Sequence, residues 1–179
     1  MGLMRPETIL FTGERVFRIC FVCTGNICRS PMAEAIFTRL VDEAGLGDLI
    51  QVTSAGTGEW HVGEQADQRT IAALGRRGLD IGDHRARRFE ADWFGRLDLI
   101  VAFDRGQERI LRHWPGAQTD RSTVATLLSF ASVRRERPDV PDPYYGGDEM
   151  FDEVLGMIEE ACTQLFRQIE PAIRLGASR

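Results

Sequence analysis

Residues 16–30, VFRICFVCTGNICRS, decide how this chain folds. Val16 to Val22 is an apolar, β-prone run, and it predicts a buried strand. Ser30 is the expected N-cap of a helix and Pro31 its first residue, because proline is favoured at that position. The apolar positions that follow recur at helical spacing as far as Ala44, where two glycines end the pattern. The segment therefore predicts a strand, a tight loop and a helix.

The rest of the chain repeats this alternation. The further expected strands are Leu49 to Thr53, Leu97 to Phe103 and Thr123 to Leu128, the last of which fits a helical turn equally well. The further expected helices are Gln65 to Leu79, Phe89 to Phe94, Gly106 to Trp114 and Asp148 to Ile173. Alternating strands and helices predict an α/β fold, a single three-layer domain with a short, mostly four-stranded parallel sheet flanked by helices. We expect the domain to span residues 16–175 and residues 1–15 to form a flexible extension.

The composition of the 179 residues weighs against several classes of protein. The net charge of −5 is unsuited to general nucleic-acid binding. No apolar run approaches the roughly 20 residues of a membrane span, and the N-terminus lacks the apolar region of a signal peptide. Four cysteines are too few for a disulfide framework, so reduced thiols are expected. We expect a cytoplasmic protein without a membrane partner, monomeric or weakly dimeric, and leave export open.

The loop from Cys23 to Ser30 has the residue types that a phosphate site needs. Backbone amides and the dipole at a helix N-terminus attract an anion. Gly25 and Asn26 can adopt the positive φ of a loop that curls around an anion, and Arg29 can bind two phosphate oxygens at once. The same positive field favours the thiolate of Cys23, a nucleophile directed at phosphorus. Ser30 can donate its hydroxyl to that sulfur.

Four segments of the sequence together resemble one enzyme family. They are CTGNICRSP at residues 23–31, SAGT at 54–57, WHVG at 60–63 and DPYY at 142–145. Through them the chain is similar to the low-molecular-weight protein tyrosine phosphatases, the bacterial members above all, from about Val16 to the final helix. The resemblance implies hydrolysis of phosphotyrosine in proteins or peptides through a phosphocysteine intermediate. It also implies inhibition by inorganic phosphate or vanadate and no need for a metal or cofactor.

The resemblance further implies roles for individual residues. Cys23 would be the nucleophile, Arg29 would hold the phosphate, and Asp142 would act as general acid and then as base. Taken alone, Asp142 followed by proline is also a common turn. Three groups would complete the site. They are the substrate-binding loop residues Thr24, Gly25, Asn26, Ile27, Cys28 and Ser30, the aromatic walls Trp60, Tyr144 and Tyr145, and the supporting residues Ser54 and His84.

Two alternative functions stay open. An arsenate reductase on the same fold would begin with the same attack, but the resembling reductases use further cysteines in mid-chain, and residues 78–90 contain none. A non-catalytic phosphopeptide-binding module would need Gly25, Asn26 and Arg29, but not Cys23 and Asp142 together.

A few remaining residues are interpreted one by one. Cys28 would either trap an oxidised Cys23 as a disulfide or simply pack in the loop. Cys20 lies three residues before Cys23, so in a strand the two side chains point to opposite faces. Cys162, on the apolar stripe of the last helix, is expected in the core. His61 and His113 are interpreted as structural, and Gln107, a departure from the family pattern, is expected to stay clear of the chemistry.

Overall fold

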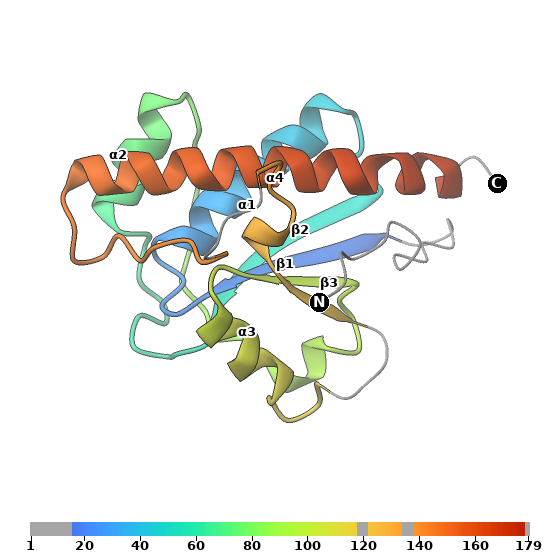
Figure 1. Cartoon of the computed structure of the whole chain (residues 1–179), viewed down its shortest axis with the longest axis horizontal. Coiled ribbons are helices and arrows are strands. Elements are labelled where there is room, and N and C mark those ends of the chain that lie inside the picture. The colour runs from blue at the N-terminus through green and yellow to red at the C-terminus, as the bar shows by residue number, and fades with distance from the viewer. Residues whose placement is uncertain (1–15, 118–121, 134–137, 178–179) are drawn as a thin grey trace.

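The computed structural model describes residues 16–117, 122–133 and 138–177, so the expected N-terminal extension, residues 1–15, lies outside the described residues. Four strands form one parallel sheet in the order β2-β1-β3-β4 (Figure 1). They are β1 (Phe17–Cys23), β2 (Ile50–Gly56), β3 (Leu99–Ala102) and β4 (Thr123–Thr126). The predicted four-stranded parallel sheet is therefore confirmed.

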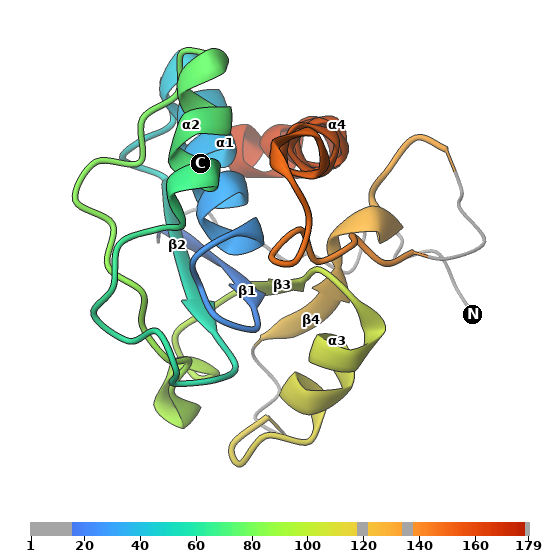
Figure 2. The same cartoon turned by 90° about the vertical axis from the view of Figure 1, so that its left-hand side faces the viewer.

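Helices cover both faces of this sheet. Figure 2 shows α1, α2 and α4 above the sheet and α3 below it, so the predicted three-layer α/β architecture is also confirmed. The α-helices are α1 (Arg29–Glu43), α2 (Gln68–Arg76), α3 (Arg105–Arg112) and α4 (Asp148–Ala177). Two short 3-10 helices are η2 (Ala91–Trp93) and η3 (Leu127–Ser129).

The central strand β1 is buried because its alternate side chains enter two separate hydrophobic clusters. On the side of α1 and α4, Phe21 packs against Phe37 with ring centroids 5.4 Å apart, and Phe37 meets Phe166 edge-on at 5.8 Å. On the other side, Cys20 joins the smaller cluster. Burying each such phenylalanine contributes about 1.5–3 kcal/mol. This packing fixes the position of β1, and with it the position of the loop that follows. It also confirms that Cys20 and Cys23 belong to opposite faces.

The predicted start of α1 is wrong by two residues, for a reason that concerns the site. The helix begins at Arg29, and its N-cap is Cys28, which makes no side-chain capping bond. The Ser30 hydroxyl does not cap the helix; it lies 3.0 Å from the Cys23 sulfur. Local propensity assigns Ser30 to capping, but in the fold its hydroxyl makes a tertiary contact with the Cys23 sulfur instead.

Other boundaries differ because tertiary hydrogen bonds extend or shorten the elements. Strand β2 continues to Gly56 since its last residues pair with β1 as far as Cys23. Helix α2 is shorter than predicted, because Asp67 caps its start by accepting from Arg69 N, and Gly78 (φ 68°) turns the chain after its end. Residues 123–128 were expected to form either a strand or a helical turn, and each expectation holds for part of them. Strand β4 ends at Thr126, and the 3-10 helix η3 follows.

Candidate active site

The loop after β1, residues 23–30, is built around a left-handed residue. Asn26 has φ 57° and is the one non-glycine with positive φ in the described part of the chain. Its side-chain amide donates to Ser30 Oγ at 2.8 Å and to Ser54 Oγ at 2.9 Å. Its carbonyl accepts from His84 Nε2 at 2.8 Å, and its Oδ1 accepts from the Arg87 amide at 2.9 Å. These bonds compensate the steric cost of the left-handed conformation.

The structure thus brings Ser54 and His84 to the loop, where the sequence analysis expected them as supporting residues. Sequence reasoning missed a third member of this network, Glu34 of α1. Its carboxylate accepts from Ser54 Oγ and lies 3.8 Å from His84 Nδ1. The pairing orients Ser54 so that its oxygen faces the Asn26 amide. No motif in the sequence marks Glu34, because its contacts arise only when α1 packs beside β2.

The Cys23 sulfur lies at the base of the loop, with the residue only 3% exposed. It accepts from the Asn26 backbone amide at 3.3 Å and contacts Ser30 Oγ at 3.0 Å. Because Asn26 already donates to Ser30 Oγ, the serine's own proton is available for the sulfur or for Ala55 O at 3.3 Å. Two donors can therefore stabilise negative charge on this sulfur.

The end of β2 approaches the loop so closely that glycine is required there. A Cβ on Gly56 would lie 2.7 Å from Thr24 O, and the next amide, Thr57 N, donates to Cys23 O at 2.8 Å. On the outer side, a Cβ on Gly25 would lie 2.9 Å from His61 Cδ2. His61 therefore lies against the loop, a placement that the sequence analysis did not foresee.

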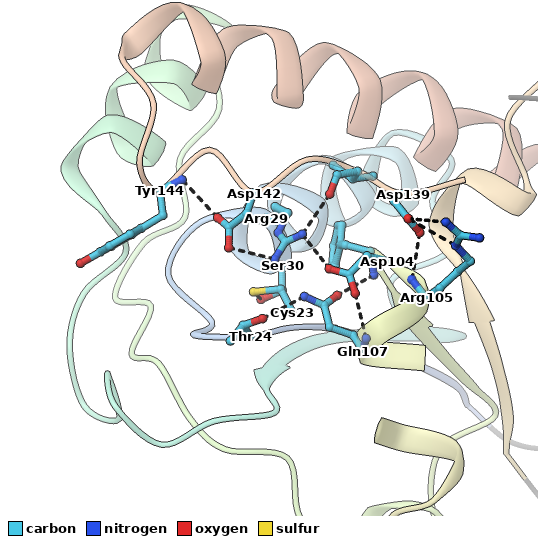
Figure 3. Close-up of polar contacts among 12 residues, drawn as sticks. Cys23, Thr24, Arg29, Ser30, Asp104, Arg105, Gln107, Asp139, Asp142 and Tyr144 are labelled. Atoms are coloured by element: carbon cyan, nitrogen blue, oxygen red, sulfur yellow. Dashed lines mark hydrogen bonds and ion pairs between the residues drawn. The ribbon is translucent and has the colours of Figure 1, made fainter. Parts of the chain in front are cut away.

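Arg29 is almost completely buried and holds three oxygens (Figure 3). Its NH1 group donates to Asp104 Oδ2 at 3.1 Å and to Val140 O at 2.9 Å, and its NH2 group donates to Asp142 Oδ2 at 3.2 Å. The structure therefore brings together the predicted Arg29 and Asp142, which are 113 residues apart in the chain. It adds Asp104, which sequence reasoning missed.

Asp104 and Gln107 form a second polar support on the other side of the loop. Asp104 follows β3 and caps α3, its Oδ1 accepting from Gln107 N at 2.8 Å. The Gln107 side chain accepts from Phe103 N at 3.0 Å and donates to Thr24 Oγ1 at 3.1 Å. Gln107 thus supports the loop through Thr24, a structural role that the sequence analysis did not foresee.

The three residues predicted to form aromatic walls differ widely in exposure. Tyr144 is 37% exposed, and its ring centroid lies 6.0 Å from that of His61. Trp60 is 73% exposed and lies over Gly58, where a Cβ would collide with its ring. Tyr145 is 95% exposed and meets Tyr144 edge-on at 5.0 Å. Their role as walls of a slot stays a prediction.

The remaining loop residues, Ile27 and Cys28, turn toward the protein interior. Burial, and then the neighbouring Asp67 carboxylate, raises the pKa of the Cys28 thiol to about 12. Burial likewise raises the pKa of Cys20 to about 12 and raises that of Cys162, a core residue as predicted. All four cysteines are free and buried.

Within residues 16–117, 122–133 and 138–177, no group of three or more His, Cys, Asp or Glu side chains is arranged to hold a metal ion. In the same residues, no helix is both long and apolar enough to cross a bilayer.

The site combines a sulfur with two donors, a buried guanidinium and a half-exposed carboxylate. Together these groups suit attack on a tetrahedral oxyanion.

Comparison with known proteins gives one consistent match. The sequence model of the family described as "Low molecular weight phosphotyrosine protein phosphatase" matches residues 18–174. The "Low molecular weight protein-tyrosine-phosphatase" of Streptomyces coelicolor is 51% identical over 158 residues, covering 88% of this chain and 96% of the relative.

Solved structures agree. The crystal structure of YfkJ from Bacillus subtilis superposes with a TM-score of 0.79 at 36% identity, covering 88% of this chain and 96% of the other. That of DARP, titled a Drosophila arginine phosphatase, superposes with a TM-score of 0.78 at 33% identity, covering 85% of this chain and 97% of the other.

Proposed function

The chain belongs to the low molecular weight phosphotyrosine protein phosphatase family and is an enzyme that hydrolyses phosphotyrosine, and we propose that it does so through a phosphocysteine on Cys23. The contacts of the Cys23 sulfur carry this proposal. It accepts from a backbone amide at 3.3 Å and lies 3.0 Å from a hydroxyl that can donate, at the start of a helix whose dipole favours an anion. That environment stabilises a thiolate before attack and after its release.

In the first step, the Cys23 thiolate attacks phosphorus in line with the bond to the phenolic oxygen. The S–P bond forms as the P–O bond breaks, and the loop amides with Arg29 hold the three non-bridging oxygens of the transferred phosphoryl group. The departing phenolate takes the proton of the Asp142 carboxyl group. The products of this step are a neutral phenol, a phosphocysteine and an ionised Asp142.

In the second step, water attacks the phosphocysteine. Asp142, now a carboxylate, accepts a proton from that water as the O–P bond forms and the S–P bond breaks. Inorganic phosphate leaves, and the thiolate is regenerated with Ser30 as donor. The same side chain thus serves as acid and then as base, which needs a position near the loop mouth, and Asp142 lies 3.2 Å from the Arg29 guanidinium.

Substrate choice follows from the rim of the site. We propose that the Tyr144 and Trp60 rings flank the phenyl group of a phosphotyrosine in a protein or peptide, with Tyr145 as a more exposed contact. Inorganic phosphate and vanadate are then expected to inhibit by occupying the loop. A reduced thiol is needed throughout, in agreement with the cytoplasmic location expected from the sequence. The enzyme is expected to work as a monomer or weak dimer and without a cofactor.

The residues of the chain favour neither rival function. An arsenate reductase of the relay type uses further cysteines in mid-chain to receive the oxidising equivalent, and residues 78–90 contain none. A phosphopeptide-binding module would not need a carboxylate 3.2 Å from the phosphate-binding arginine.

Cys23→Ser and Asp142→Ala test the proposal with phosphotyrosine peptide as substrate in EDTA. Cys23→Ser is expected to abolish turnover while phosphate and vanadate still bind. Asp142→Ala is expected to lower kcat by about 10²–10⁴ without weakening phosphate binding. Because DARP is described as an arginine phosphatase, a phosphoarginine peptide is the competing substrate. Arsenate with a thiol reductant tests the alternative function of arsenate reductase. Faster hydrolysis of phosphoarginine would redirect the substrate assignment, and full activity of Cys23→Ser would overturn the mechanism.

A further inference from the structure

Arg69, on the first turn of α2, joins two loops that sequence reasoning treats separately. Its NH1 group donates to Gly146 O at 2.8 Å, and its NH2 group donates to Tyr144 O at 3.0 Å. Both carbonyls belong to the segment that follows Asp142. Its guanidinium carbon lies 4.4 Å from the centroid of the buried Phe151 ring, at the start of α4. Arg69 therefore holds the far end of the loop that carries Asp142.

The other side of the guanidinium is anchored to the phosphate-binding loop. Arg69 Nε and NH2 donate to the two oxygens of Asp67 at 3.0 and 2.7 Å. The Asp67 backbone amide in turn donates to Ile27 O at 2.9 Å. The hydrogen bonds from Arg69 lower the pKa of Asp67, so this carboxylate stays charged at neutral pH. A planar guanidinium with four of its N–H directions in use has little freedom to shift.

These hydrogen bonds form a closed circuit. They run from Ile27 O to Asp67, from Asp67 to Arg69, and from Arg69 to Tyr144 O. The Tyr144 amide then donates to Asp142 Oδ1 at 3.1 Å (Figure 3). The other Asp142 oxygen returns to Arg29, two residues after Ile27. Arg69 thus holds the carbonyl of Tyr144, and the amide of the same Tyr144 orients the Asp142 carboxylate.

We propose that Arg69 is a positioning residue that sets the distance and orientation of Asp142 relative to the phosphate-binding loop. This inference rests on the proposed role of Asp142 as general acid. Arg69 itself touches no substrate atom in this role; it acts through the backbone of Tyr144. Its loss should therefore impair proton donation while leaving phosphate binding by the Cys23 loop intact.

The test compares leaving groups of different basicity. Phenyl phosphate needs a proton on its departing oxygen, whereas p-nitrophenyl phosphate, with a far better leaving group, needs it much less. In Arg69→Lys, which keeps the charge but loses the fork, and in Arg69→Gln, kcat/KM for phenyl phosphate should fall about 10- to 100-fold. This ratio reports only the steps up to formation of the phosphocysteine, so it excludes the later role of Asp142 as base. For p-nitrophenyl phosphate kcat/KM should fall much less, and the inhibition constant of inorganic phosphate should stay within about twofold of wild type.

The matched control is Arg76→Gln. Arg76 lies on the same helix and bonds Asp152 of α4 at 2.8 Å, so its loss also removes an α2–α4 contact, but one remote from Asp142. Thermal unfolding of all variants accounts for any general loss of stability. If Arg69 acts through Asp142, the double variant Arg69→Lys with Asp142→Ala should be no slower than Asp142→Ala alone.

The outcomes distinguish a failure of the acid role of Asp142 from a failure of the positioning role of Arg69. If Asp142→Ala shows no greater loss with phenyl phosphate than with p-nitrophenyl phosphate, the acid assignment itself fails. If Asp142→Ala shows that dependence and Arg69→Lys does not, only the positioning role is overturned. An equal loss with both substrates, a weaker affinity for phosphate or additive losses in the double variant would likewise refute it.

Discussion

Replacing Asn26 should damage both the fold and the site, by amounts that can be worked out from its contacts. The side chain is completely buried and makes three hydrogen bonds, two as donor to Ser30 and Ser54 and one as acceptor from the Arg87 amide. Each is worth about 1 kcal/mol net. In Asn26→Ala, the left-handed φ of 57° adds about 1 kcal/mol of steric cost. We therefore expect a loss of about 4 kcal/mol in the free energy of unfolding, or about 10 °C in Tm.

Asn26→Gly serves as the matched control because it removes the same bonds and tolerates the left-handed conformation. After allowing for about 0.5 kcal/mol from the greater backbone entropy of glycine, it should be more stable than Asn26→Ala by roughly 0.5 kcal/mol. Where the variants remain folded, the loop loses its preset conformation, and phosphate should bind about 10- to 100-fold more weakly.

Urea unfolding and competitive inhibition by phosphate measure these two effects. An Asn26→Ala variant as stable as wild type would show that the network contributes nothing. A glycine variant less stable than the alanine variant would show that the left-handed conformation is not a cost. Unchanged phosphate affinity in both variants would refute the claim that Asn26 shapes the anion site.

Three further predictions follow from other contacts. Iodoacetamide at pH 7 should modify Cys23 but not Cys28, because burial raises the pKa of the Cys28 thiol to about 12. Phosphate should slow the modification of Cys23. Peptide mass mapping measures the labelling, and equal labelling of the two cysteines would contradict the prediction. Because the pKa of Asp67 is lowered in the fold, its stabilising contribution is present above the unfolded value near 4 and is lost as pH falls. Urea midpoints of wild type and Asp67→Asn should therefore converge below about pH 4, and a constant gap would count against the ion pair. Asp104→Asn should lower kcat/KM about tenfold, since Arg29 loses an orienting partner, and a normal value would exclude that role.

Much of the fold could be predicted because its signals are local. The apolar run before Cys23 and the helical stripe after Pro31 each depend on residues within a few positions of one another, and the structure confirms both elements. The ends of elements were predicted less well. Ser30 is a good N-cap by propensity, but its hydroxyl contacts a sulfur seven residues earlier in the chain, and a one-dimensional pattern does not contain that competition.

The candidate site divides in the same way. The Cys23 loop is one continuous segment, so its chemistry could be inferred directly, whereas Arg69 and Gln107 reach the site only through packing of α2 and α3. Asp104 could have been found. It follows the strand Leu99–Ala102 at the carboxyl edge of the sheet, where β3 pairs with β1, and the argument that located the Cys23 loop applies equally to it.

The two carboxylates on Arg29 have the same partner but different surroundings, and the difference assigns their roles. Asp104 is fixed through both oxygens, one at Arg29 and one at the N-terminus of α3, where the helix dipole favours an anion. Asp142 lies on a loop with its side chain 47% exposed, close to where a phosphate dianion would bind. That position leaves the Asp142 carboxyl group able to reach a leaving oxygen, as its proposed role of general acid requires. We therefore infer that Asp104 orients the guanidinium, whereas Asp142 serves the leaving oxygen.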